Sequence, residues 1–399
     1  MNRPTPNPPL PLDGITVVSL EHAIAAPLAT RHLADLGARV IKVERPGVGD
    51  FARAYDHRVD GLASHFVWVN RSKESLTLDL KRPEAQEILH ELLGRADVLV
   101  QNLAPGAAAR LGLSFEALSP RNPGLIVCDI SGYGDGGPYT HKKAYDLLIQ
   151  SESGFLSITG TPEEQVKAGI SIADIAAGMY AYSNILGALI ERGRSGRGRR
   201  IEIAMIDAMV EWMGFPLYYA YKDQEPPRRS GASHATIYPY GPFRAGDGRT
   251  VMLGLQNERE WTVFCDKVLG DAALAADPRY ASNALRVASR DAVRAMIERA
   301  FADLSAEEVI ARLDAADIAN AHVSTMNDLW RHPQLEARGR WTSVDSPAGP
   351  LPVLQPPGMG GDHPARMGPV PALGAHTDAI LAELGYGGRA AELRDGKVV

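Results

Sequence analysis

Two aspartates stand where a carboxylate could do chemistry. Asp174 opens the run 174–192, whose apolar residues recur at spacings of three and four and so indicate a packed helix, and Asp146 lies upstream in the segment 144–148. A carboxylate in the first turn of a helix meets unpaired N–H groups and the positive end of the helix dipole, which favour the anion and suit a nucleophile. Aspartate is also a preferred N-cap residue, so the pattern alone leaves a structural interpretation open for both.

Polar residues also gather where predicted strands end. Short apolar strands alternate with helical runs that begin near Pro27 and Pro83, which is typical of βαβ units in a doubly wound parallel sheet. The predicted strands are 15–20, 39–44, 75–80, 97–100, 125–130 and, farther along, 200–204. Ligands of such sheets bind at the carboxyl ends of the strands. The segments expected at those ends are 21–23, 44–50, 101–102 and 131–134.

One motif after a predicted strand resembles a nucleotide-binding loop but lacks the helix that such a loop needs. Residues 132–137 match GxGxxG, but Pro138 follows at once and no helix start is predicted there to receive a pyrophosphate. The chain has no P-loop, HExxH or GxSxG motif, and its 11 histidines show no metal-ligand spacing. We therefore expect neither a nucleotide redox cofactor nor a metal.

Composition narrows the class of protein further. The chain has 399 residues and a net charge of -6, which favours an enzyme of small metabolites over a nucleic-acid-binding protein. Cys128 and Cys265 form no CxxC pair and fit a reducing compartment. Residues 1–11 lack the apolar core of a signal peptide, and no run reaches the roughly 18 apolar residues of a membrane span. We expect a cytoplasmic protein with no membrane or nucleic-acid partner.

Ordered motifs along nearly the whole chain resemble the class III CoA-transferase family, which includes formyl-CoA:oxalate and carnitine CoA-transferases. The matching segments are 33–46, 49–50, 70–73, 78–80, Asn102 with 105–106, 110–112, 131–134, 137–138, 173–174, 201–205, 332–333 and 373–377. The resemblance implies an interlocked homodimer, whose chain has a large Rossmann-like CoA-binding domain and an inserted small α+β domain. The implied boundaries are 1–204 and 346–399 for the large domain, 205–230 for a linker, 231–325 for the small domain and 326–345 for a return linker.

The resemblance also assigns roles to the two aspartates. In that family an aspartate attacks an acyl-CoA thioester, and the motif match places this nucleophile at Asp174, while Asp146 falls where relatives carry an acid near the reacting carbonyl. The related α-methylacyl-CoA racemases have a histidine acid/base just before that acid. This chain has Tyr145 there, and a tyrosine with a pKa of about 10 is a poor proton shuttle. The function implied is transfer through an aspartyl-CoA thioester; an acyl-CoA racemase or isomerase, or a catalytically silent acyl-CoA binding protein, is the alternative.

CoA itself is implied as the acyl carrier and substrate. Small residues from Ala23 to Ala26 would let the thioester approach the backbone. Cations expected in loops or helix starts beyond strand ends would meet the phosphates. The cations that match family positions in contact with CoA are Arg45, Lys73, Arg110 and Lys143.

The acceptor acid is indicated by the remaining segments. Residues 254–261 and 318–322 look like the branch that handles C4 and C5 dicarboxylates, with succinyl-CoA as donor and itaconate, mesaconate or citramalate as acceptor, whereas 233–240 replace the glycine-rich loop of oxalate-type enzymes. A dicarboxylate needs a cation for its second carboxylate. The candidates are His22, Arg53, His65, Arg228 and Arg259.

Overall fold

The structure is a computed structural model that describes residues 9–399. The described chain forms two compact units, the first made of residues 9–153, 168–213 and 334–399 and the second of residues 154–167 and 214–333. Residues 154–167, which the sequence analysis assigns to the large domain, thus belong to the second unit. Residues 205–213 and 334–345, assigned to the two linkers, belong to the first.

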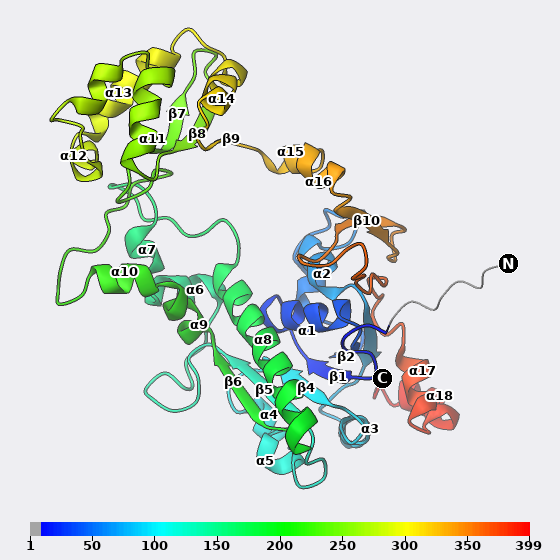
Figure 1. Ribbon diagram of the computed structural model, residues 1–399. Coiled ribbons are helices and arrows are strands. Elements are labelled where there is room, and N and C mark those ends of the chain that lie inside the picture. The colour runs from blue at the N-terminus through cyan, green and yellow to red at the C-terminus, as the bar shows by residue number, and fades with distance from the viewer. Residues whose placement is uncertain (1–8) are drawn as a thin grey trace. The chain divides into compact units, whose positions relative to one another are not determined.

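A six-stranded parallel sheet organises the first unit (Figure 1). Its order, β3-β2-β1-β4-β5-β6, is the doubly wound order of dinucleotide-binding folds. The prediction of an α/β fold with a parallel sheet is confirmed. The strands are β1 (Thr16–Leu20), β2 (Arg39–Glu44), β3 (Lys73–Thr77), β4 (Val98–Gln101), β5 (Ile126–Ser131) and β6 (Arg200–Ala204).

The central strands are continuous runs of Val, Ile and Leu because both faces of the sheet are covered. Val17 pairs with Val40 on one side and Val98 on the other, and all three are buried. The helices that follow or cover the strands are α1 (Ala25–Asp35), α2 (Ser64–Asn70), α3 (Pro83–Leu93), α4 (Ala107–Arg110), α5 (Phe115–Leu118), α6 (Asp146–Glu152), α8 (Ile172–Ser195), α9 (Met205–Trp212), α17 (Thr377–Glu383) and α18 (Ala390–Asp395), with short 3-10 turns η1 (Phe51–Ala54) and η4 (Gly387–Arg389). Helix α16 (Pro333–Ala337) and the antiparallel hairpin β10 (Trp341–Val344) and β11 (Leu351–Leu354) stand between the second unit and α17 in the chain.

Helices α1 and α8 lie side by side, and their close approach depends on one glycine (Figure 1). A Cβ atom built on Gly178 of α8 would come within 2.6 Å of the Ala25 carbonyl oxygen of α1. The buried face of α8 is made mostly of small residues, among them Ala173, Ala177 and Ala181. This small-residue face sets the first turn of α8 beside the beginning of α1.

The second unit is a small α+β structure with its own core. Its sheet is antiparallel, in the order β7-β8-β9, and large side chains such as Trp261, Phe264 and Phe301 fill its interior. Its elements are α7 (Phe155–Ile158), α10 (Gly214–Tyr219), β7 (Tyr240–Arg244), β8 (Thr250–Gly254), α11 (Glu258–Val263), the π-helical turn η2 (Phe264–Val268), the 3-10 turn η3 (Ala272–Ala276), α12 (Asn283–Ala288), α13 (Arg290–Phe301), α14 (Ala306–Ala315), β9 (Asn320–His322) and α15 (Met326–Leu329).

Some predicted boundaries are wrong. The strand predicted at 75–80 spans Lys73–Thr77. Helix α8 runs past the predicted end at 192 to Ser195, and it is followed by Gly196, whose φ of 69° is the left-handed conformation that glycine adopts at helix ends. None of the helices in residues 9–399 combines the length and apolarity needed to cross a membrane.

Candidate active site

The strand order reverses between β1 and β4, and in doubly wound sheets ligands bind beside the loops that follow the two strands at such a point. Asn102, directly after β4, bridges the two loops. Its side-chain amide donates to the His22 carbonyl oxygen at 2.9 Å, and its Oδ1 accepts from the His22 N–H at 2.9 Å. The loop after β1, which the sequence analysis places at the ligand edge, is thereby fixed to the loop after β4.

The same loop is held from the other side by Asp50. Ala23 has a φ of 61°, a left-handed conformation that costs an alanine about 1 kcal/mol or more. Its N–H donates to Asp50 Oδ1 at 3.1 Å, and Ala52 N–H donates to the same oxygen at 2.9 Å. Next to it, the His22 ring stacks on Phe51 with centroids 5.1 Å apart. The strained turn before α1 is therefore set by the segment after β2.

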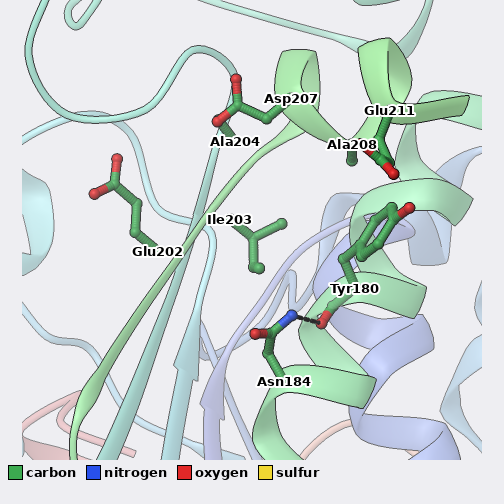
Figure 2. Close-up of a pocket in the computed structure, with 8 residues that line it drawn as sticks. All are labelled: Tyr180, Asn184, Glu202, Ile203, Ala204, Asp207, Ala208 and Glu211. Carbon is green, nitrogen blue, oxygen red and sulfur yellow. Dashed lines mark hydrogen bonds between the residues drawn. The ribbon is translucent and has the colours of Figure 1, made fainter. Parts of the chain in front are cut away.

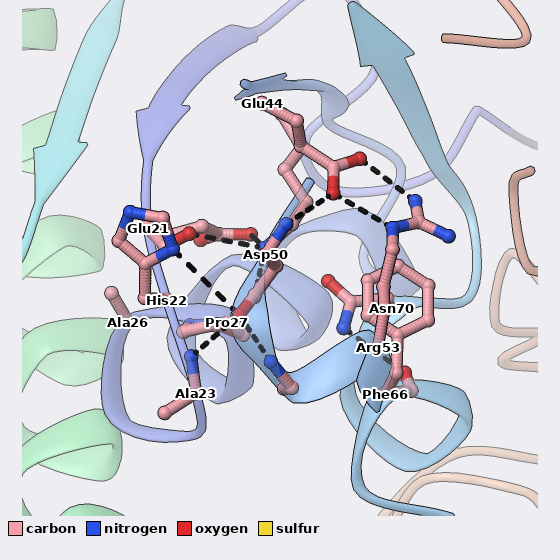
Figure 3. A network of polar contacts seen from close by, with 12 residues as sticks. Glu21, His22, Ala23, Ala26, Pro27, Glu44, Asp50, Arg53, Phe66 and Asn70 are labelled. Atoms are coloured by element: carbon pink, nitrogen blue, oxygen red, sulfur yellow. Dashed lines mark hydrogen bonds and ion pairs between the residues drawn. The ribbon is translucent and has the colours of Figure 1, made fainter. Parts of the chain in front are cut away.

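Behind this turn lies a network of buried charges (Figure 3). Lys42 Nζ donates to Asp50 Oδ2 at 2.8 Å and lies 3.4 Å from Glu21 Oε1, while Lys73 Nζ donates to Glu21 Oε1 at 2.7 Å. Burial alone would raise the pKa of Glu21 and of Asp50, but the two lysines outweigh it at Glu21, and Lys42 with nearby hydrogen-bond donors outweighs it at Asp50, so both pKa values are lowered. Burial would likewise lower the pKa of Lys42, yet the surrounding carboxylates raise it. The network thus favours the ionised forms of Glu21, Asp50 and Lys42 inside the protein.

Two predicted CoA-binding residues belong to this interior. Lys73 is the first residue of β3 rather than part of a loop, its side chain is fully buried, and its ammonium donates to Glu21, to the Pro27 carbonyl oxygen at 2.9 Å and to Asn70 Oδ1 at 3.1 Å. Burial lowers its pKa to about 7, against the opposing effect of Glu21. Ala26 is also fully buried, in the first turn of α1. The arrangement gives no support to phosphate or thioester contacts by either residue.

The other predicted cations do lie at the surface. Arg45 directly follows β2, Arg110 is the last residue of α4 after β4, and Lys143 lies in the segment between β5 and α6. All three are exposed, and Arg110 lies over Gly106, whose added Cβ would come within 3.1 Å of the guanidinium. Arg110 thus ends a helix instead of starting one, but all three cations follow strands of the sheet at its carboxyl edge.

Asp174 lies in the first turn of α8 and is half-buried. The first-turn N–H groups of that helix are taken by another aspartate, since Asp146 Oδ1 accepts from Ala173 N–H at 2.8 Å and from Asp174 N–H at 3.3 Å. Burial, together with the charge of Asp146, raises the pKa of Asp174 to about 7. The expectation that the helix end favours the Asp174 anion is therefore wrong, because Asp146 uses the donors and adds a like charge.

Tyr55, in the segment after β2, interacts electrostatically with aspartates of the candidate site. Burial and the charges of Asp50, Asp174 and Tyr145 raise its pKa. Tyr55 also contacts Phe51 and His65, at ring centroid distances of 5.7 and 5.4 Å. The segment after β2 and the start of α8 are thus close enough for their ionisable groups to interact. The sequence analysis missed Tyr55 because a lone tyrosine in a loop carries no signal of its own.

The candidates for binding a second carboxylate differ in their exposure and in their partners. Arg53 makes a bidentate pair with Glu44, both distances 2.8 Å, and stacks over Phe66. His22 is half-exposed, and its Nδ1 lies 3.7 Å from Asp50 Oδ1, beyond hydrogen-bonding distance; His65 stands in the same relation to Asp56. Arg228 and Arg259 are exposed residues of the second unit.

A separate pocket of about 280 Å³ lies among α8, β6 and α9 (Figure 2). Its polar lining is mostly acidic, with Glu202, Asp207 and Glu211, and the Asn184 amide there donates to the Tyr180 carbonyl oxygen at 2.9 Å. None of the predicted site residues lines it. Within residues 9–399, no group of three or more His, Cys, Asp or Glu side chains is placed to hold a metal ion.

Comparison with known proteins identifies relatives along the whole chain. The model of "CoA-transferase family III" matches residues 12–377. A succinate–glutarate CoA-transferase of Agrobacterium fabrum is 36% identical over 95% of this chain and 97% of its own length, and an acetyl-CoA:oxalate CoA-transferase of Acetobacter aceti is 35% identical over 85% and 87%. The crystal structure of a CAIB/BAIF family protein from Brucella suis superimposes with a TM-score of 0.84 at 34% identity, covering 94% of this chain and all of that one.

Proposed function

Because this chain belongs to CoA-transferase family III, we propose that it moves CoA from succinyl-CoA to a small dicarboxylic acid through a thioester between CoA and Asp174. The observation that carries the proposal is the position of Asp174, a half-buried carboxylate beside Asp146 at the carboxyl edge of a doubly wound sheet. Ligands of such sheets bind at that edge.

The proposed reaction needs a carboxylate and no net proton transfer. An oxygen of the ionised Asp174 attacks the thioester carbonyl, the C–S bond breaks, and CoA leaves as a thiolate. The thiolate attacks the Asp174 carbonyl carbon of the mixed anhydride and releases the donor acid as a carboxylate. The acceptor carboxylate then attacks the carbonyl carbon of the aspartyl-CoA thioester, and CoA leaves again as a thiolate. The thiolate attacks the acceptor carbonyl carbon of the new mixed anhydride, which forms the acceptor-CoA thioester and returns Asp174 as a free carboxylate. Each step conserves charge, so the nucleophile only has to be ionised.

The chain's other residues take defined parts in this proposal. Arg45, Arg110 and Lys143 are exposed cations on segments that follow strands, and they suit the phosphates of CoA. The turn at Ala23, held by Asp50 and by the bridge from Asn102 to His22, would border the thioester. Asp146 would hold the first turn of α8 and set the basicity of Asp174.

A C4 or C5 dicarboxylate is the acceptor class we propose. The relative from Agrobacterium fabrum is named for succinate and glutarate, which supports acids of this length and adds glutarate to itaconate, mesaconate and citramalate. In the structure His22 is half-exposed beside Asp50, and it suits a second carboxylate better than Arg53, which is paired with Glu44. Oxalate is the second candidate, because a relative of comparable identity is named for it.

We also propose that the working form is a homodimer. In the second unit, α10 and the residues after it expose large apolar side chains, namely Phe215, Leu217, Tyr218 and Tyr221. Contiguous exposed apolar surface is typical of protein interfaces. Light scattering after size-exclusion chromatography is expected to give twice the chain mass of 43.0 kDa, and a monomer at micromolar concentration would contradict this part of the proposal.

Intact-protein mass spectrometry tests the central step. The protein is incubated with succinyl-CoA, and a covalent CoA adduct that maps to Asp174 is expected, with release of succinate. Glutarate, itaconate, mesaconate, citramalate and oxalate are then added one at a time, and the true acceptor is expected to discharge the adduct. Asp174→Asn is the matched control, expected to form no adduct and to lose at least about 1,000-fold in rate.

Two other outcomes would support the alternatives. Exchange of the substrate α-proton in deuterated water without an acceptor acid would indicate a racemase or isomerase, in which Tyr145 would need to move a proton. Binding of acyl-CoA with neither adduct nor product for any acid would indicate a catalytically silent binding protein.

A further inference from the structure

The side chain of Gln150 is the most completely enclosed polar group near Asp146. Gln150 lies one turn after Asp146 in α6 and is 0% exposed. Its Nε2 donates to Asp146 Oδ2 at 2.7 Å, and its Oε1 accepts from the Ala168 N–H at 2.9 Å. A carboxylate can only accept and a backbone N–H can only donate, so these two partners fix the orientation of the amide.

The amide completes the surroundings of the Asp146 carboxylate. Oδ2 accepts from Gln150, while Oδ1 accepts from the N–H groups of Ala173 and Asp174. All three partners are N–H donors, which suits a carboxylate and leaves no acceptor for a carboxyl proton. With both oxygens engaged, the carboxylate can neither rotate about its own axis nor turn away from α8 without losing a buried hydrogen bond.

Gln150 also connects this carboxylate to the chain that leads into α8. Ala168 is the residue at which the described chain returns to the first unit, four residues before α8 begins. The helix α6, the residues before α8 and the first turn of α8 are thus joined through the Asp146 and Gln150 side chains. The distance between Asp146 and the nucleophile is set by this joint.

We infer that Gln150 is a positioning residue, which holds the Asp146 carboxylate against the first turn of α8 and so fixes the like charge that Asp174 meets. The inference rests on the function proposed above, in which Asp174 is the nucleophile. Gln150 touches no reacting atom and acts only through Asp146. A residue that merely stabilised α6 would affect the amount of folded protein but not the pH at which Asp174 ionises.

The test compares two substitutions through the pH dependence of the rate of CoA transfer from succinyl-CoA to glutarate. Gln150→Met keeps the volume but removes both hydrogen bonds, so Asp146 is free to move away. The acid limb of the pH profile is then expected to shift to lower pH by about 0.5–1 unit, with a maximal rate lower by about 10-fold. Tyr55, the titratable group whose own pKa the Asp174 charge raises, is unchanged in this variant.

Gln150→Glu is the conservative variant. A protonated carboxyl group at this position can still donate to Asp146 and accept from Ala168, so the variant is expected to keep the acid limb of the unchanged protein. When the introduced carboxyl group ionises, the donor is lost and two carboxylates face each other, so the rate is expected to fall at alkaline pH, where the unchanged protein stays level. The profile of this variant should therefore become bell-shaped.

Gln101 provides a matched control. It too is a buried glutamine whose amide bridges a carboxylate, Asp129, at 2.8 Å and a backbone N–H, that of Leu103, at 2.7 Å. Gln101→Met is expected to leave the acid limb where it is, whatever it does to stability.

The outcomes separate the inference from the function on which it rests. If the unchanged protein forms no CoA adduct at Asp174, the proposed function fails and the role of Gln150 falls with it. If the unchanged protein reacts but both Gln150 variants keep its profile, only the inference about Gln150 is overturned. If Gln150→Met does not fold, the Gln150→Glu profile decides alone, because that variant regains the hydrogen bonds at low pH.

Discussion

Asp146 and Asp174 are joined by a hydrogen bond in which the backbone N–H of Asp174 donates to Asp146 Oδ1 at 3.3 Å. The donor that would stabilise the Asp174 anion is therefore spent on a second carboxylate. Burial and the charge of Asp146 raise the pKa of Asp174 to about 7. A more basic carboxylate is a better nucleophile once it is ionised, but part of it is protonated at neutral pH. The charge of Asp146 therefore makes the ionised form of Asp174 more reactive but lowers the fraction of Asp174 that is ionised at neutral pH.

The first prediction concerns the pH dependence of transfer. Because the pKa of Asp174 is raised to about 7, protonation removes the nucleophile below that pH. The value of kcat/KM for succinyl-CoA is expected to fall about tenfold per pH unit on the acid side and to level off on the alkaline side. Asp146→Asn removes the like charge and should move the midpoint down by about one unit. A rate that does not change between about pH 5 and about pH 8 would contradict the role of Asp174.

The second prediction concerns stability. A carboxyl group whose pKa is higher in the folded than in the unfolded protein favours folding fully at a pH below its ordinary value, and this contribution is lost as the pH rises through about 7. At alkaline pH the folded protein must hold an ionised Asp174 in surroundings that disfavour the charge, and Asp174→Asn removes this charge. The free energy of unfolding of the variant should therefore exceed that of the unchanged protein by about 1 kcal/mol at pH 8, with little difference near pH 4. Thermal unfolding at the two pH values measures this.

A matched control for this stability effect is available on α9. Asp207 is also an aspartate in the first turn of a helix, but it is exposed. Asp207→Asn is expected to change the free energy of unfolding by less than about 0.5 kcal/mol at either pH. An equal gain in both variants at alkaline pH would show that the gain does not come from the surroundings of Asp174.

The third prediction separates surface cations from buried ones. Substitution of Arg45, Arg110 or Lys143 by Gln is expected to raise KM for succinyl-CoA about tenfold and to leave the acceptor KM unchanged, because these exposed groups would meet phosphates. Lys73→Met instead removes the nearer of the two ammonium groups that pair with the buried Glu21 carboxylate, and it should lower the free energy of unfolding by about 3 kcal/mol.

Steady-state kinetics and urea unfolding of the same four variants check this division. Lys81→Gln, an exposed lysine outside the candidate site, is the control for a general loss of positive charge. The variant that lacks the cation in contact with the 3′-phosphate of CoA should also lose the ability to distinguish CoA esters from their dephospho-CoA counterparts. If Lys73→Met raises KM for succinyl-CoA without lowering the free energy of unfolding, Lys73 contacts CoA after all.

The sequence predicts most of the strands of the sheet, but it does not predict the network of buried charges. Strands β2 and β6 match the predicted ranges to the residue, since runs such as 39–44 alternate with clear helical segments. The sequence favours a surface position for Lys73 because a lysine is rarely buried without a partner, and its partner Glu21 lies 52 residues away in the chain. No local pattern reports a pairing of that separation.

Parts of the candidate site carry a usable signal. Asp174 stands at the start of a helical run, but that pattern alone leaves a structural role open, and its role as nucleophile is what the family resemblance implies. Asp50 lies in the segment 44–50 that the sequence analysis expects at the ligand edge of the sheet. Gln150 stands four residues after Asp146, a spacing that puts both side chains on one face of a helix, so their contact is available to a search for such pairs. That Asp146 caps α8 rather than its own helix depends on how α6 packs, which the sequence does not state.

The last prediction concerns the second carboxylate of the acceptor. The His22 ring is stacked on Phe51 at an interplanar angle of 16°, half-exposed, with Nδ1 3.7 Å from Asp50 Oδ1. The ring nitrogen of His22 that faces away from Asp50 could donate a hydrogen bond to a substrate carboxylate. His22→Phe keeps the stack and removes this donor, so kcat/KM is expected to fall about tenfold for glutarate and less than about twofold for pentanoate, a chain of equal length with one carboxylate. His65→Phe is the matched comparison, because His65 also stands 3.7 Å from a carboxylate, that of Asp56, and packs against Tyr55. If kcat/KM for glutarate alone falls in His65→Phe and is unchanged in His22→Phe, His65 is the residue that recognises the second carboxylate. If kcat/KM falls equally for both acids in both variants, neither histidine recognises it.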